Sequence, residues 1–473
     1  MAAAVMATLD PDEAATIAQG RWATGLPSAP LTSFAFDTRR LQPGETFVAL
    51  RSERADGHDF LHKAFDYRAN AALVERPNPD IELPQLVVRD SLEALHALAG
   101  NWRERFKAPV IGITGSYGKT TVKEMLGIVM GTQWFHTRGN YNNHIGVPLS
   151  LLELDPRRHA GAILEAGIND VNEMPLLAGM IQPDMAIITA VGPAHLERLG
   201  DIEGVAREKA VLAHAVRPGG SVFIPASLLQ HEPFRTIPEA IQVFALSGPG
   251  ETTDPAWEQL PNVTIYQYKW TELKHSRGAG TLETVEPVSP GSFSFKAGSQ
   301  GMVSNLALVV HVALHLGVPQ STLQACLDAW RPFRQRGEVI RNRETWFYVD
   351  CYNANPGSMI DSAQRFAKLF PRMPHIYVLG SMKEMGTASA EWHRRTGEQI
   401  LLKEGSTVYL VGEEAAPMAE SLHQRGFATD KVHLVKDTGE LAERIKSFRG
   451  AVFLKGSRSL GLEKLVPEGG VRC

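Results

Sequence analysis

Cysteine is scarce in this sequence. The 473-residue chain has three cysteines, Cys326, Cys351 and Cys473, and no two of them have Cys-x-x-Cys spacing. A disulfide framework needs more cysteines, and a cysteine zinc site needs closely paired ones. The sequence therefore supports neither, and it predicts a protein of the reducing cytoplasm.

Long apolar runs are also missing. The longest, from Leu306 to Val318, contains two histidines and is too short to cross a bilayer, so we expect a buried helix there. The alanine-rich start of the chain meets Asp10, Asp12 and Glu13 before a secretory apolar region develops, and no basic segment precedes it. The sequence therefore predicts neither a signal peptide nor a membrane span.

The chain has no strong excess of charge of either sign. It has 48 Lys and Arg residues against 52 Asp and Glu, a formal net charge of -4, and no long basic run. This balance argues against nucleic acid as the main partner. The length allows two to four domains, each with its own core, and we find neither an internal repeat nor a low-complexity tract.

The most informative segment runs from Gly112 to Thr121. It follows an apolar strand-like stretch and precedes a helical pattern, the setting of a phosphate-binding loop. Its glycines allow backbone N–H groups to surround an anion, Lys119 can reach a terminal phosphate, and Thr120 can offer its hydroxyl to Mg2+. The segment predicts binding of a nucleoside triphosphate; the alternative is a glycine turn without a ligand. The predicted ATP-binding residues here are Thr114, Gly115, Ser116, Tyr117, Gly118, Lys119, Thr120 and Thr121.

The order of strand-like and helical segments predicts an α/β protein of three domains. A helix from about Ser91 to Phe106 and a proline at position 109 mark the first boundary, and Arg331-Pro332 marks the second. We therefore expect domains at residues 1–106, 107–331 and 332–473. Strands are expected at Ala162–Glu165, Met185–Thr189 and Ser221–Ile224 in the second domain and at Trp346–Asp350, Ile376–Leu379, Thr407–Val411 and Ala451–Leu454 in the third.

Alternation of this kind is typical of parallel sheets covered on both faces. The second domain is thus expected to be a phosphate-loop ATPase-like sheet, and the third a Rossmann-like α/β unit. The polar stretch from Gly248 to Gly291, with the strand-like run Val263–Tyr266, predicts an antiparallel edge or flap.

Two further polar residues follow predicted strands of the second domain. Glu165 closes one strand, and His195 lies in the loop after the next. The carboxyl ends of parallel strands share one edge of a sheet, so these side chains are expected to meet Thr120 and coordinate Mg2+ that bridges ATP phosphates.

A segment dense in amides, from Gly139 to Leu149, includes Asn142 and Asn143. Amide side chains both donate to and accept from a polar substrate, and flanking glycines permit close backbone approach. The alternative is a hydrogen-bonded turn, and the sequence alone leaves the two interpretations open.

Taken together, these motifs resemble those of the Mur ligases over nearly the whole chain. The matching elements are Asp37-Thr38-Arg39, Pro43 to Leu50 and Asp56 to Phe60 in the first domain, Thr114 to Thr121 and Gly139 to Leu149 in the second, and Asp350 to Pro356 and Lys455-Gly456-Ser457-Arg458 in the third. Several independent matches in the same order make the resemblance specific.

The resemblance implies an ATP-dependent amide ligase of peptidoglycan precursor synthesis. It implies that UDP-N-acetylmuramoyl-tripeptide is activated by ATP as an acyl phosphate and is then joined to D-alanyl-D-alanine. The first domain would bind the UDP-sugar through Asp37, Thr38, Arg39, Asp56 and His58, and Asn142 and Asn143 would also contact substrate. The alternative for Asp37 and Arg39 is that they pair only with each other. A monomer is expected.

The same resemblance assigns the catalytic residues. Lys119 would neutralise the transferring phosphoryl group, Thr120 and Glu165 would serve a first Mg2+, and His195 with Lys209 a second. Lys209 would carry a carbamate, which turns a repelling ammonium into an anionic oxygen ligand. Two residues of the third domain, Arg336 and Asn353, match positions around the nucleotide.

The chain also departs from the family pattern. Ser381 stands where the family usually has an aspartate, with Lys383 and Glu384 close by, and Gly298-Ser299-Gln300-Gly301 replaces Gly-x-His-Asn. Two alternatives therefore stay open: a diverged ligase that uses another amine acceptor, and a catalytically silent nucleotide-binding relative.

Overall fold

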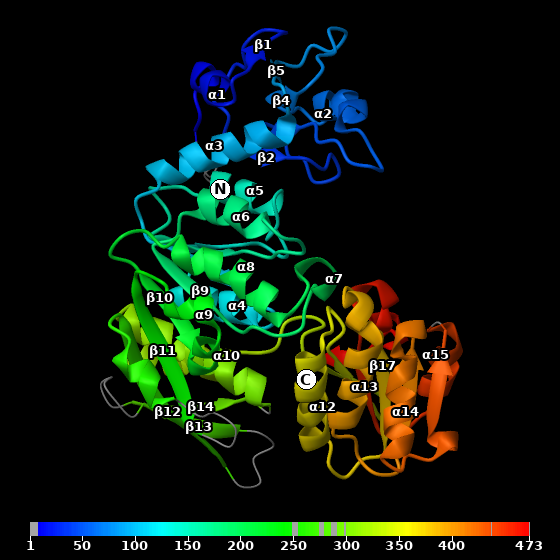
Figure 1. Cartoon of the computed structure of the whole chain (residues 1–473). Helices are drawn as coiled ribbons and strands as arrows, with labels where there is room; N and C mark the ends of the chain where they lie inside the picture. The colour runs from blue at the N-terminus through cyan, green and yellow to red at the C-terminus, as the bar shows by residue number, and fades with distance from the viewer. Residues whose placement is uncertain are drawn as a thin grey trace.

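The computed structural model describes residues 8–247, 254–273, 279–284, 291–297, 299–436 and 438–472. Gly298 and Cys473 therefore lie outside the described residues, as does much of the stretch from Gly248 to Gly291. The described chain forms three mixed α/β sheets of five, nine and seven strands, which follow one another along the sequence (Figure 1). This arrangement confirms the predicted α/β fold class.

The first sheet has the strand order β1-β5-β4-β3-β2. All its neighbours run parallel except β1, which is antiparallel to β5. Its elements are α1 Pro11–Ile17, β1 Arg21–Trp22, β2 Phe34–Ala35, β3 Thr46–Val48, η1 Gly57–Phe60, α2 Leu61–Asp66, β4 Ala71–Val74, β5 Gln85–Val87 and α3 Ser91–Arg105.

The central sheet has the order β14-β13-β12-β11-β10-β9-β6-β8-β7. Its strands are parallel from β7 to β12, and β13 and β14 extend it as an antiparallel edge. The expected parallel sheet is thus confirmed, and an antiparallel edge is present, but β13 and β14 form it, whereas the run Val263–Tyr266 pairs in parallel with β11. The elements are β6 Val110–Thr114, α4 Lys119–Met130, β7 Trp134–His136, α5 Gly146–Leu152, β8 Gly161–Glu165, α6 Glu173–Ile181, β9 Met185–Ile188, α7 Leu196–Leu199, α8 Ile202–His214, β10 Ser221–Pro225, α9 Glu232–Arg235, β11 Ala240–Ser247, β12 Val263–Glu272, β13 Ala279–Thr284, β14 Ser292–Lys296, α10 Gln300–His315 and α11 Gln320–Ala329.

Separate apolar clusters cover the two faces of this sheet. Successive residues of β6 point to opposite faces, so Val110 packs in a cluster with residues of α3, α5, α6 and α8, whereas Ile111 packs with residues of α4, α10 and α11. Because both faces are covered, all five residues of β6 are buried. The phosphate loop that follows β6 thus starts from the interior of the domain.

The third sheet has the order β19-β18-β17-β20-β16-β15-β21 and is parallel from β19 to β16, with β15 and β21 antiparallel. The four strands expected here are β16, β17, β18 and β20. The elements are β15 Glu338–Asn342, β16 Thr345–Val349, α12 Pro356–Leu369, β17 His375–Gly380, η4 Gly386–Ala388, α13 Ser389–Gln399, β18 Thr407–Val411, α14 Ala416–Gln424, β19 Val432–Val435, α15 Gly439–Lys446, β20 Ala451–Lys455 and β21 Val471–Arg472.

Helix α3 joins the first sheet to the central region. Asp90 caps its N-terminus by accepting hydrogen bonds from the backbone N–H groups of Leu92 and Glu93. Near its C-terminal end, Trp102 Nε1 donates to the Leu154 carbonyl at 2.8 Å, and the fully buried Arg103 guanidinium donates to groups at and just after the end of α6. Helix α3 is thus part of the central core as well as of the first sheet.

The part of the chain that the structure describes contains no helix that is both long enough and apolar enough to cross a membrane. The apolar stretch that begins at Leu306 lies largely within α10, most of whose residues are buried. The expected buried helix is therefore present.

Candidate active site

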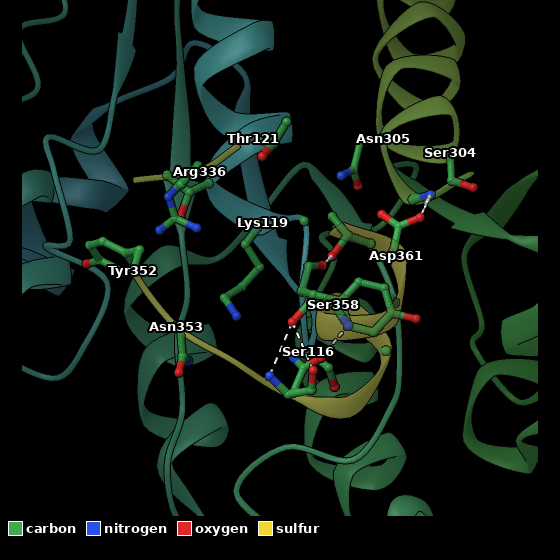
Figure 2. A pocket seen from close by; sticks show the side chains of 18 of the residues that line it. Ser116, Lys119, Thr121, Ser304, Asn305, Arg336, Tyr352, Asn353, Ser358 and Asp361 are labelled. Carbon is green, nitrogen blue, oxygen red and sulfur yellow. Dashed lines mark hydrogen bonds between the residues drawn. The ribbon is translucent and has the colours of Figure 1, made fainter. Parts of the chain in front are cut away.

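A cavity of about 670 Å3 opens between the phosphate loop of the central region and the third sheet. It is lined from three directions: by the loop and the start of α4, by residues at the start of α10, and by residues at the start of α12 (Figure 2). Twelve of the predicted site residues line it, namely Ser116, Tyr117, Gly118, Lys119, Thr120, Thr121, Asn142, Asn143, Glu165, His195, Arg336 and Asn353.

Glycine gives the phosphate loop its conformation. Gly115 has φ +150°, and a Cβ added there would lie 2.1 Å from Thr189 Oγ1; Gly118 has φ +87° and caps α4. At Gly115 there is no room for a side chain, and at Gly118 the left-handed backbone would strain any residue that has one. The loop is also fixed to the segment after β9, because the Ser116 N–H donates to the Ala190 carbonyl at 2.8 Å. It is therefore built to bring backbone N–H groups close to an anion.

Lys119 begins α4 and places its ammonium beside the loop, where it donates to the Gly115 carbonyl. Burial lowers the pKa of Lys119, the Glu165 charge raises it, and the Arg336 charge lowers it further. In Figure 2 the Lys119 side chain points into the middle of the cavity. It is thus placed to meet a phosphate.

Thr120 and Glu165 lie in direct contact, as the sequence predicted. The Thr120 hydroxyl donates to the Glu165 carboxylate, with distances of 3.2 and 3.1 Å to its two oxygens. Asn142 Nδ2 donates to the same carboxylate at 2.8 Å. Glu165 is 2% exposed, and the ammonium of the buried Lys123 lies 3.9 Å from it. Oxygen ligands of this kind suit a hard cation such as Mg2+.

The two predicted asparagines have different partners. Asn142 contacts Glu165, whereas Asn143 Oδ1 accepts hydrogen bonds from the N–H groups of Ile145 at 3.2 Å and Gly146 at 2.9 Å. Asn143 therefore stabilises the turn into α5, which corresponds to the alternative that the sequence left open. Both side chains still line the cavity.

His195 precedes α7 and has φ +56°. Its Nδ1 lies 2.6 Å from Oε2 of Glu384, which follows β17 in the third sheet. The hydrogen bond to His195 is the main reason that the pKa of the Glu384 carboxyl is lowered. His195 thus links the central region to the third sheet at the edge of the cavity.

Lys209 lies on α8, is 1% exposed and does not line the cavity. Among the described residues its ammonium has no hydrogen bond or ion pair. Burial holds the pKa of Lys209 well below its usual value, and the nearby positive charge of Lys119 lowers it further. A lowered pKa increases the neutral fraction of the amine, which is the form that can react with CO2.

Two cations of the third-sheet region, Arg336 and Lys455, line the same cavity. The Arg336 guanidinium lies 4.1 Å from the centroid of the Tyr352 ring, and Arg458, which does not line the cavity, lies 5.0 Å from the same centroid. The buried Lys455 ammonium forms an ion pair with Asp350 at 2.9 Å and donates to the Asn353 carbonyl at 3.2 Å. Positive charge thus faces the phosphate loop across the cavity.

The predicted residues of the first domain lie outside this cavity and are bonded to one another. Arg39 Nη2 lies 2.7 Å from Asp37 Oδ2, the pairing that the sequence kept as an alternative, while Thr38 is 9% exposed. Asp56 accepts from the His58 backbone N–H at 3.0 Å, and His58 Nδ1 lies 2.6 Å from the same carboxylate. A binding role for these residues stays a prediction.

Ser381, where the family usually has an aspartate, is fully buried and does not line the cavity. Its hydroxyl donates to the Val411 carbonyl at 3.3 Å, and a Cβ added at Gly412 would lie 2.4 Å from its oxygen. Lys383 pairs with Glu414 at 2.7 Å. The Ser381 side chain therefore lacks direct access to a substrate in the cavity.

Several lining residues were not singled out from the sequence. They are polar and charged side chains of α10 and α12: Ser304, Asn305, Ser358, Asp361 and Arg365. Asp361 and Arg365 are four residues apart, a spacing that normally indicates a solvent-exposed ion pair on a helix. The sequence offered no other signal, because only the packing of α12 against the start of α10 turns this face towards the cavity.

The described residues include no group of three or more His, Cys, Asp and Glu side chains that would hold a metal ion by themselves. Mg2+ commonly uses only one or two carboxylates and takes its other ligands from water and phosphate. The Thr120 and Glu165 pair fits that pattern.

Comparisons with known proteins agree with this site. The Mur ligase middle domain matches residues 113–246, and the glutamate ligase domain of Mur ligases matches residues 335–458. The UDP-N-acetylmuramoyl-tripeptide–D-alanyl-D-alanine ligase of Bacillus subtilis is 30% identical over 442 residues, which is 92% of each chain.

Solved structures of MurF are similar over nearly the full length. That from Acinetobacter baumannii has a TM-score of 0.81 at 27% identity and covers 98% of both chains. MurF of Thermotoga maritima, determined in complex with ADP, has a TM-score of 0.74 at 26% identity and covers 92% of this chain and 96% of its own. The present chain therefore belongs to the Mur ligase family and is an ATP-binding, ATP-dependent ligase that forms carbon–nitrogen bonds.

Proposed function

We propose that this chain joins D-alanyl-D-alanine to UDP-N-acetylmuramoyl-tripeptide at the expense of ATP, a step in the synthesis of the peptidoglycan precursor. The observation that carries the proposal is the single cavity in which Lys119, Glu165 and His195 face Arg336 and Asn353 of the third sheet. The similarity to the Bacillus subtilis ligase over 92% of both chains supports the choice of substrates.

The chemistry follows from the poor reactivity of a carboxylate towards amines. A carboxylate oxygen of the tripeptide attacks the γ-phosphorus of ATP, and ADP leaves with the electrons of the broken P–O bond. The amine of the dipeptide then attacks the acyl carbon, and the tetrahedral intermediate collapses with loss of phosphate and a proton. Lys119 would neutralise charge on the phosphoryl group, and Arg336, which lines the cavity on the opposite side, would add a second positive charge.

Two Mg2+ ions are part of this proposal. Thr120 and Glu165 would hold the first, because their oxygens already lie 3.1 to 3.2 Å apart, and His195 with Lys209 would hold the second. When bound, Mg2+ would neutralise phosphate oxygens and so make the γ-phosphoryl group easier to attack.

We also propose that Lys209 carries a carbamate. The buried amine has no partner among the described residues, and its lowered pKa favours the nucleophilic neutral form. A carbamate places an anion near Lys119, so the charge of Lys119 stabilises the modified form, whereas it disfavours the protonated amine.

We propose that the three domains bind the ligands that the sequence predicted for them. Residues 1–106 would bind the UDP-sugar, residues 107–331 ATP, and residues 332–473 the acceptor together with part of the nucleotide. A hydrogen bond of 3.0 Å from Arg40 Nη1 to the Tyr141 hydroxyl connects the first part to the amide-rich segment. That the enzyme is a cytoplasmic monomer stays a prediction.

ADP release measured against a panel of acceptors tests this function. With UDP-N-acetylmuramoyl-tripeptide present, we expect D-alanyl-D-alanine to stimulate ADP release more than any other dipeptide or single amino acid. Lys119→Ala should lose about 10^2- to 10^3-fold in rate, because it removes charge neutralisation at the phosphate.

Lys107→Ala is a matched control, since Lys107 is exposed and lies outside the cavity. Preference for a different amine would identify a diverged ligase. No acceptor-dependent turnover at all would identify a catalytically silent relative.

A further inference from the structure

Beyond the phosphate loop, the cavity reaches two charged side chains of α12 that have no role in the ligase chemistry above. Asp361 and Arg365 are one helical turn apart, and both line the cavity. Arg365 is 8% exposed, and its Nε and Nη1 have no hydrogen-bond partner among the described residues. Buried donors without partners are costly, so this guanidinium is placed to receive acceptors from a ligand.

The Asp361 carboxylate occupies the space that a side chain at position 301 would need. Position 301 is glycine, and a Cβ added there would lie 2.6 Å from Asp361 Oδ2. The carboxylate accepts from Ser299 Oγ at 2.8 Å and from the Gly301 N–H at 3.0 Å, each to a different oxygen. Each oxygen can accept a second hydrogen bond. Asp361 thus presents acceptors to the cavity at the start of the 16-residue helix α10.

This pair adjoins the phosphate loop. A Cβ added at Gly118 would lie 2.3 Å from Asn305 Oδ1, so α10 contacts the loop directly. Figure 2 shows Asp361, Ser304 and Asn305 on one side of Lys119, and Arg336, Tyr352 and Asn353 on the other. A ligand with its phosphates at Lys119 can therefore extend to α12.

The charges of Asp361 and Arg365 determine which ligand groups can bind beside them. The Asp361 carboxylate repels phosphate and requires donors, whereas Arg365 requires acceptors. The nucleoside part of ATP presents both: ribose hydroxyls and an exocyclic amino group donate, and hydroxyl oxygens and ring nitrogens accept.

We propose that Asp361 and Arg365 form the subsite that recognises the nucleoside part of ATP. The proposal rests on the function above, in which the phosphate loop holds the triphosphate. A dipeptide acceptor, with its ammonium and carboxylate, is the other ligand of matching charge. It is disfavoured because the subsite adjoins the phosphate loop, where Asn305 contacts Gly118, so a group that is joined to the bound phosphates reaches the subsite directly.

Inorganic tripolyphosphate is the discriminating probe, because it shares the phosphates of ATP and lacks the nucleoside. Calorimetry should show that Asp361→Ser and Arg365→Met each weaken ATP binding by about tenfold or more, the size expected for hydrogen bonds to charged groups. Both should leave tripolyphosphate binding within about twofold of the parent. Asp361→Asn, which keeps one acceptor oxygen, should lose less than Asp361→Ser.

Lys368→Met provides the matched control on the same helix, because Lys368 is exposed and lies outside the cavity. Arg365→Lys, which keeps the charge, is the second variant to measure if Arg365→Met does not fold. Thermal melting of each variant shows whether it is folded.

Lys119→Ala separates the two proposals. If it weakens both ligands while Asp361→Ser and Arg365→Met change neither, the nucleoside subsite is wrong and the ATP site stands. Equal losses for both ligands in the Asp361 and Arg365 variants, or a raised KM for the dipeptide alone, would also overturn the subsite. If Lys119→Ala changes neither affinity, the proposed ATP site itself is wrong.

Discussion

At the scale of single residues, the cavity combines groups that the sequence identified with groups that it did not. The phosphate loop, Glu165 and His195 were identifiable because each lies at the end of a buried strand or in the loop after it, and strand ends meet at one edge of a parallel sheet. Asp361 and Arg365 were not, since charged residues four apart on a helix usually face solvent. Which distant parts of the chain a side chain contacts depends on tertiary packing, and no local sequence pattern contains that information.

Lys209 gives the first prediction at this scale. Lys209→Ala should be nearly inactive, because no carbamate can form, and a small carboxylate such as acetate should restore part of the activity. Independently of activity, 13C NMR of the enzyme in 13C-bicarbonate should show a carbamate signal that Lys209→Ala lacks. Arg207→Ala, at an exposed position of α8, should keep the signal. Full activity of Lys209→Ala in CO2-depleted buffer would contradict the assignment.

Ser381 gives the second prediction at the scale of single residues. The family aspartate has no room here, because Ser381 is fully buried against Gly412 and the Val411 carbonyl. Ser381→Asp should therefore lower the free energy of unfolding by roughly 1–3 kcal/mol or more through a buried carboxylate without a partner, and should not improve use of D-alanyl-D-alanine. Urea unfolding and steady-state kinetics measure the two effects. A stable variant with a higher kcat/KM for the dipeptide would show that the lost carboxylate matters for the acceptor.

At the scale of elements, the short 3-10 helix η1 shows how predicted binding residues also stabilise structure. Asp56 caps η1, and both ring nitrogens of His58 are engaged: Nδ1 by Asp56, and Nε2 by the backbone N–H groups of Glu75 at 2.9 Å and Arg76 at 3.3 Å. The sequence run Asp56 to Phe60 was recognised correctly as a distinct unit, but whether its side chains bind a ligand or each other depends on chain segments 17 to 20 residues away.

This network predicts a pH dependence. Hydrogen bonds from the backbone and ring of His58, with the Arg76 charge, lower the pKa of Asp56 to about 2. A lowered carboxyl pKa stabilises the fold above the unfolded value of about 4, and this contribution is lost as pH falls through about 2.

Asp56→Asn should therefore be less stable than the parent at pH 7, by a difference that shrinks as the pH is lowered from 4 towards 2. Urea unfolding at pH 7, 4 and 3 measures it, with Asp59→Asn on the same helix as the control. A difference that is constant with pH would contradict a role for the charge.

At the scale of the whole molecule, helix α3 makes the first sheet and the central region interdependent. The sequence predicted the helix and placed a boundary at its end, since a proline follows. Its packing against the central region could not be predicted, because the partners of Trp102 and Arg103 in that region lie 52 or more residues further along the chain.

A fragment of residues 1–106 should consequently fold poorly. It would expose Trp102 and Phe106, which are 6% and 0% exposed in the full chain, and leave the Arg103 guanidinium without the carbonyls of Ile181 and Gln182. We expect no cooperative thermal transition by circular dichroism and no UDP-sugar binding by calorimetry. A sigmoidal melting curve for the fragment would show that the first sheet is independent of the central region.

The central claim is that one cavity, formed by the phosphate loop and the third sheet, activates a UDP-linked peptide acid and joins it to D-alanyl-D-alanine. The most direct measurement is mass spectrometry of the UDP-linked product after incubation with ATP, Mg2+, UDP-N-acetylmuramoyl-tripeptide carrying 18O in its terminal carboxylate, and D-alanyl-D-alanine. We predict a UDP-linked pentapeptide, one ADP for each amide bond formed, and one 18O transferred from the carboxylate to inorganic phosphate. ADP formation without a pentapeptide, or a pentapeptide without 18O in the phosphate, would contradict the account.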